Sequence, residues 1–125
     1  MESLRTYLIK AMVINVKTDK ERYFNQLLAL LGAFPPFNVL TDREREVFGY
    51  LLLAYNSAKG DEVVRFETTF SIISKETIRM KLGISKFNLN NLLNGLRKKG
   101  FVSFNYIHKQ YILRPDKELT FKFIN

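Results

Sequence analysis

The sequence contains no cysteine, so it forms no disulfide bond and no thiolate zinc site. It has one histidine, His108, and neither an HExxH motif nor a phosphate-binding GxxxxGKS/T motif. No stretch stays apolar over the roughly 18 residues that a membrane span needs. The first residues, Met1-Glu2-Ser3, do not match a secretory signal peptide. We therefore expect neither an enzyme nor a membrane protein. We expect no metal, cofactor or small-molecule substrate, and a location in the cytoplasm or within a virion.

Acidic residues are absent between Glu76 and Asp116. The net charge is +8, and residues 84–125 carry six of these charges, with eight basic and two acidic side chains. The acid-free window contains the cations Arg79, Lys81, Lys86, Arg97, Lys98, Lys99, Lys109 and Arg114. Such a surface attracts a polyanion and releases its counterions, which favours nucleic acid as a partner. The alternative is a solvated basic surface that serves solubility.

The length of 125 residues and the absence of repeats predict a single domain, residues 1–125. The β-branched apolar run 6–16 predicts a strand, with a helix as the alternative. An amphipathic helix follows, ended by Gly32 and Pro35-Pro36. Its apolar stripe is a candidate protein interface: Phe24, Leu27, Leu28 and Leu31. We regard residues 1–40 as an extension that could serve in oligomerisation, and residues 41–125 as the core.

Thr41 stands three residues before Glu44, which is the spacing of a capping box at a helix start. The β-rich residues 62–72 predict a strand. Ser74 is the expected cap of a short helix that Gly83 ends, and Ser85 the cap of a second helix, 86–99. Residues 101–114 predict a hairpin around the polar break at 108–110, and the alternating residues 118–125 predict a strand.

The stretch "SKETIRMKLGISKFNLNNLLNGLRKKGFV" resembles the paired helices of the winged-helix DNA-binding family. The piece "LGIS" is similar to the tight turn between those helices, and "LRKKGFV" to the end of a recognition helix that enters the wing. The resemblance covers residues 41–114. It implies an α+β fold, with a winged helix-turn-helix core and an N-terminal strand and helix extension. It also implies a role such as transcription regulation.

A helix over 86–99 has two different faces at 100° per residue. Leu89, Leu92, Leu93 and Leu96 form a core face. The opposite side carries Phe87, Asn91, Asn94 and Lys98, flanked by Asn90 and Arg97. Asparagine can donate to and accept from an adenine edge, and lysine can contact phosphates. The expected nucleic-acid contacts are Lys86, Asn90, Asn91, Asn94, Arg97, Lys98, Lys99, Lys109 and Arg114.

Two functions follow from these patterns. The first is double-stranded DNA binding, as a regulator or a packaging or replication factor, through helix 86–99 and a basic wing. The second is a structural role in a phage particle or other assembly, in which Phe87 and the N-terminal helix contact protein. Four aromatic residues after the helix are expected in a sheet core, with a stacking platform for single strands as the alternative: Phe101, Phe104, Tyr106 and Tyr111.

Overall fold

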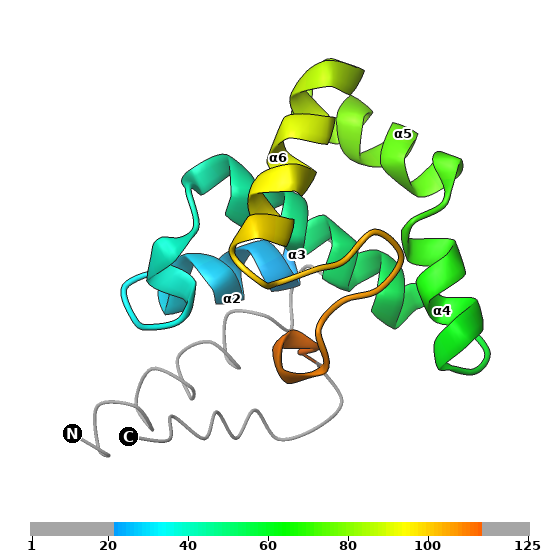
Figure 1. Ribbon diagram of the computed structural model, residues 1–125, viewed down its shortest axis with the longest axis horizontal. Coiled ribbons are helices and arrows are strands. Elements are labelled where there is room, and N and C mark those ends of the chain that lie inside the picture. Colours follow the sequence, from blue (N-terminus) through cyan, green and yellow to red (C-terminus); the bar gives the residue numbers. More distant parts are fainter. Residues whose placement is uncertain (1–21, 114–125) are drawn as a thin grey trace.

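The helix α3 (Asp42–Ser57) runs through the middle of residues 22–113, which are the residues that the computed structural model describes (Figure 1). It contacts each of the other four helices of this region. These are α2 (Tyr23–Leu31), α4 (Glu62–Thr69), α5 (Ile72–Leu82) and α6 (Lys86–Lys98). Two short 3₁₀-helices complete the elements: η1 (Phe37–Val39) and η2 (Lys109–Tyr111).

The predicted α+β winged-helix fold is wrong for these residues. Residues 22–113 contain no strand, and their only β pairing is an isolated antiparallel bridge between Val102 and Ile107. A wing needs a hairpin of paired strands, and this loop has one bridge. The strands predicted over 6–16 and 118–125 lie outside the described residues.

The strand predicted over 62–72 is wrong, because these residues form α4 and the start of α5. The Asp61 side chain accepts a hydrogen bond from the backbone N–H of Val64 at 3.0 Å, which starts α4. Thr69 lies buried at its end and donates to the Arg65 carbonyl. The cap and this packing outweigh the β preference of the two valines, which is strongly dependent on context.

The hairpin turn predicted at 108–110 is wrong, because residues 109–111 form η2. The chain instead turns back between Ser103 and Tyr106, where the Ser103 N–H donates to the Tyr106 carbonyl at 2.8 Å. The His108 N–H then donates to the Phe101 carbonyl at 3.0 Å. A short turn-back loop therefore stands where a basic wing was expected.

The helix starts and stops follow local signals. The predicted capping box is confirmed, with the Glu44 N–H donating to Thr41 Oγ1 and the Thr41 N–H donating to Glu44 Oε1. α5 begins at Ile72 rather than after Ser74, because Ser71 is its cap. Gly83 ends α5 in the left-handed conformation, with φ at 63°, where a β-carbon would be strained.

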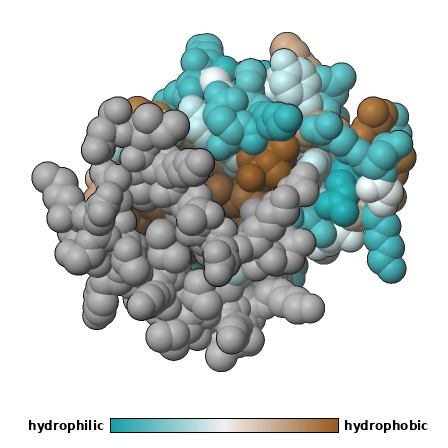
Figure 2. All heavy atoms as spheres, turned by 90° about the horizontal axis from the view of Figure 1, so that it is seen from below, coloured by the Kyte–Doolittle hydropathy of each residue, from teal (hydrophilic) through white to brown (hydrophobic). Residues whose placement is uncertain are grey.

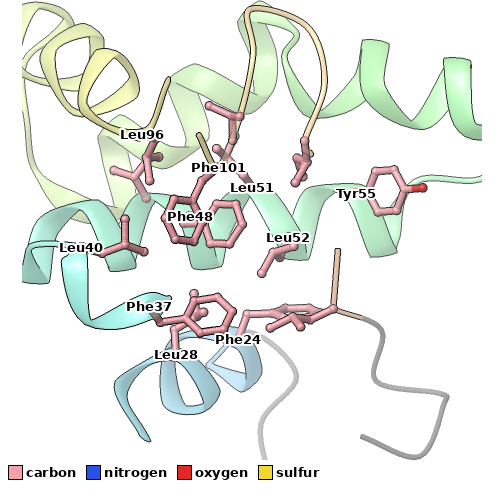
Figure 3. Packing of buried hydrophobic residues seen from close by; sticks show 14 of the residues in the cluster. Phe24, Leu28, Phe37, Leu40, Phe48, Leu51, Leu52, Tyr55, Leu96 and Phe101 are labelled. Carbon is pink, nitrogen blue, oxygen red and sulfur yellow. The ribbon is translucent and has the colours of Figure 1, made fainter. Parts of the chain in front are cut away.

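The core lies between α2, α3 and α6, with side chains from η1 and the segment after α6 (Figure 3). The Phe48 ring of α3 packs edge-on against the Phe101 ring, with 5.4 Å between the ring centroids. Phe101 stacks on Tyr111, with 4.3 Å between the ring centroids. Seen from below, the described surface is mostly polar. Apolar residues show in a band beside the grey atoms and again at the end where α4 lies (Figure 2).

Candidate nucleic-acid interface

α6 is the helix whose surface carries most of the residues predicted to contact nucleic acid. The predicted helix and its Ser85 cap are confirmed, with Ser85 Oγ accepting from the Asn88 N–H at 3.1 Å. Its inner face is buried against the core through Leu89, Leu93 and Leu96. Leu92 is half-buried at the edge of this face. This packing fixes which side of α6 is turned to solvent.

The outward face of α6 is exposed along its whole length. Five exposed residues lie on the side away from the leucines: Phe87, Asn90, Asn91, Asn94 and Lys98. We include Lys86 as the sixth residue, at the edge of this face near Leu93, because it is also exposed. Phe87 is 72% exposed, so its ring is not part of the core. Lys86 and Lys98 form no ion pair with any acid of residues 22–113, so no acid of this region competes with an anion for their ammonium groups.

Arg97 lies across the flank of α6 rather than extending into solvent. Its guanidinium donates to the Asn94 side-chain oxygen and lies over the Phe104 ring, 4.1 Å from the centroid. Its Nε is buried and has no hydrogen-bond partner within the described residues. Asn94 and Phe104 therefore hold Arg97 in place, and the amide oxygen of Asn94 is already engaged within the chain.

Lys99, also predicted to contact nucleic acid, is directed at the start of α3. Its ammonium donates to Glu44 Oε1 at 2.5 Å, and the Glu44 side chain is 7% exposed. The same oxygen accepts the N–H of Thr41 at 2.8 Å. The carboxylate that caps α3 thus also binds the residue after α6, so the Lys99 ammonium is engaged in an ion pair within the chain.

Gly95 leaves room for the Glu44 carboxylate on the surface of α6. A β-carbon at position 95 would collide with the Glu44 Oε2 atom. The glycine sits inside α6, where it costs about 1 kcal/mol relative to alanine in helix stability. The close approach of Glu44 explains why this loss is tolerated.

The pKa of the Glu44 carboxyl reflects two opposed effects. Burial alone would raise this pKa, but the hydrogen bonds from Lys99 and Thr41 outweigh burial and lower it below the ordinary glutamate value. A carboxyl whose pKa is lower in the folded state stabilises the fold at pH values above its unfolded pKa, about 4.3. This stabilisation is lost as the pH falls through the folded pKa.

Glu44→Gln is therefore expected to lower the free energy of unfolding by about 1–3 kcal/mol at pH 7, because it removes a charge-assisted contact. The difference from wild type should shrink as the pH falls below about 4.3, because the unfolded wild type then takes up a proton that the folded state resists. Urea unfolding at a series of pH values measures the loss at pH 7 and its change with pH. Glu46→Gln is the matched control, because the Arg43–Glu46 pair is exposed and its loss should cost under about 1 kcal/mol. A Glu44 difference that stays constant down to about pH 3 would contradict this explanation.

The remaining predicted nucleic-acid residues lie beyond α6. Lys109 is exposed at the first position of η2. Arg114 lies outside the described residues. Of the two cations predicted for a basic wing, the part of the chain between residues 22 and 113 contains Lys109, which is exposed on a 3₁₀-helix.

The predicted protein-interface residues divide into two groups. Phe24, Leu27, Leu28 and Leu31 are all buried in the core of this chain, where α2 packs on α3. Phe87 is the one residue of the predicted interface that lies on the surface.

α5 has an exposed apolar surface that the sequence analysis did not predict. Ile72, Ile73 and Met80 are 80–81% exposed and lie opposite the buried Ile78 at 100° per residue. The sequence does carry a signal for this surface, since α5 has more apolar residues than one buried face requires. The sequence prediction places Ile78 and Leu82 inward and gives no position to the other apolar side chains.

The described residues offer no metal site. Within this part of the chain, no group of three or more His, Cys, Asp or Glu side chains could hold a metal ion. The His108 ring instead packs edge-on against the Tyr106 ring, with 5.4 Å between the ring centroids. None of the helices between residues 22 and 113 has the length and apolar character to cross a membrane.

Comparisons with protein-family models, with curated proteins and with solved structures found no match to this chain. No family match therefore supports the resemblance to winged-helix domains. A functional proposal has to be argued from the surface of α6.

Proposed function

We propose that this chain binds double-stranded DNA through the outward face of α6. The observation that carries the proposal is that this face joins two lysines, unpaired within residues 22–113, to three exposed asparagines on one helix: Lys86, Lys98, Asn90, Asn91 and Asn94. An α-helix fits the major groove of B-DNA, and an asparagine amide matches the adenine edge there. Such a role belongs in the cytoplasm or within a virion.

Each element of α6 has a distinct part in this proposal. The buried leucines hold the helix on α3, so binding requires no ordering of the helix backbone. Lys86 and Lys98, at the two ends of α6, would contact phosphates and set the position of the helix. Asn91, between them, would contact a base edge. Lys99 is left out of this set because Glu44 binds it.

A salt series with short duplex DNA tests the proposal. Binding should weaken linearly in log affinity against log salt, because each phosphate contact releases counterions. Lys98→Ala should weaken binding to all sequences alike and reduce the salt slope by about 1. Lys59→Ala is the matched control, because Lys59 is exposed beyond the C-terminal end of α3 and should leave the slope unchanged. No binding at low salt would rule the proposal out.

A second function, contact with another protein in an oligomer or larger assembly, is favoured by the exposed apolar residues Ile72, Ile73 and Met80 of α5, together with Phe87. Exposed apolar patches on a surface often mark protein contacts. Under this alternative, Met80→Ser would weaken an oligomer seen by light scattering and leave DNA affinity unchanged. A wild-type protein that stays monomeric at high concentration would argue against self-association.

A further inference from the structure

The loop after α6 presents an aromatic ring to solvent from a fixed base. Val102 and Ile107 form the β-bridge and are each 1% exposed, which anchors the two arms of the loop in the core. The hydrogen bond from the Ser103 N–H to the Tyr106 carbonyl closes the turn between them. Phe104, inside this turn, is 74% exposed. The ring is thus held in place and not packed on the core.

Arg97 covers one face of this ring. Its guanidinium lies 4.1 Å from the ring centroid, and its hydrogen bond to Asn94 fixes it from the α6 side. The high exposure of Phe104 leaves the opposite face of the ring to water. An aromatic face in water, with a cation behind it, is suited to a flat π-system.

A nucleobase is the flat group that this setting favours. Aromatic side chains stack on unpaired bases with a useful gain in affinity, largely without regard to sequence. In a continuous duplex the faces of each base are covered by its neighbours, so only an unpaired or terminal base offers a free face. The phosphates beside such a base would meet α6 and the loop after it, and this stretch of the chain contains no acid between residues 77 and 113.

We propose that Phe104, backed by Arg97, is a stacking site for an unpaired base of a nucleic acid whose duplex part is bound by α6. The proposal rests on the DNA-binding function of α6 and narrows it to DNA with a single-stranded extension or junction. Asn94 connects the two sites, because it belongs to the outward face and holds Arg97. Phe104 itself provides the stacking surface.

The test compares three duplexes at fixed salt: one blunt, one with a short thymidine extension, and one with an abasic extension of equal length. The abasic extension keeps the phosphates and removes the bases. The thymidine extension should increase affinity about 5- to 100-fold over the abasic one. Phe104→Leu should remove this gain, measured as the affinity for the thymidine extension relative to the abasic one.

A fluorescent variant gives a second readout. The chain has no tryptophan, so Phe104→Trp introduces a single reporter that can still stack. Its emission should be quenched by the thymidine extension and not by the abasic one. Val39→Trp, at an exposed position of η1, is the control and should show no difference between the two.

The outcomes distinguish failure of the stacking site from failure of DNA binding by α6. If blunt and extended duplexes bind but the thymidine gain survives in Phe104→Leu, the stacking site is wrong and DNA binding by α6 stands. The stacking site is also wrong if Phe104→Leu weakens all three duplexes equally, or none, as expected of a ring that contacts the duplex or a protein. If no duplex binds at low salt, both proposals fail.

Discussion

Replacing Phe48 by alanine is expected to lower the free energy of unfolding by about 3–5 kcal/mol, because the substitution leaves a cavity in the middle of the core. Phe48 is fully buried on α3, and its ring packs edge-on against Phe101, which lies just after α6. Figure 3 shows the Phe48 ring among the buried side chains. α3 is in contact with α2, α4, α5 and α6, so a cavity here weakens the packing that holds the helices together.

Chemical denaturation followed by circular dichroism measures this loss. Phe87→Ala is the matched control: it makes the same chemical change at a residue that is exposed on α6, and it should change stability by no more than about 0.5 kcal/mol. If Phe48→Ala does not fold, Phe48→Leu should give a smaller loss of about 1 kcal/mol. Equal losses at Phe48 and Phe87 would contradict the described core.

Replacing Asn91 by alanine is expected to reduce discrimination between DNA sequences by about 1–3 kcal/mol, which is the range for one bidentate base contact. Asn91 is exposed on the outward face of α6, and no hydrogen bond within residues 22–113 engages its side chain. The Asn94 amide already accepts from Arg97, so Asn94→Ala should have a smaller effect on discrimination.

Competition between two duplexes of different sequence measures this discrimination. Asn38→Ala, at an exposed position of η1, is the control and should leave the preference unchanged. If Asn91→Ala weakens all sequences equally, α6 contacts DNA without a base contact from Asn91. If it changes neither affinity nor preference, Asn91 lies outside the interface.

The helix ends that could be predicted are those with a strong local signal. The Thr41–Glu44 pair and Ser85 each satisfy backbone N–H groups within three residues, so their effect does not depend on the rest of the chain. Gly83 is similarly local, because the left-handed turn favours glycine whatever surrounds it. The leucine spacing of α6 indicated its buried face, because the helical period of apolar residues is also a signal within one element.

The parts that could not be predicted depend on contacts between distant residues. Val63 and Val64 favour a strand by type, but the Asp61 cap and the contacts of α4 with α3 select a helix. No local pattern shows that Lys99 reaches Glu44, which is 55 positions away. The sequence alone therefore presents Lys99 as a free cation, and it shows no connection between Arg97 and Phe104.

The most direct test of the central claim is an NMR titration of the ¹⁵N-labelled protein with duplex DNA at low salt. DNA binding through α6 predicts that the largest shift changes fall on backbone and side-chain amides of Lys86–Lys98, led by Asn90, Asn91 and Asn94, with little change in α2. Largest changes on the exposed face of α5, or none at α6, would contradict DNA binding through α6.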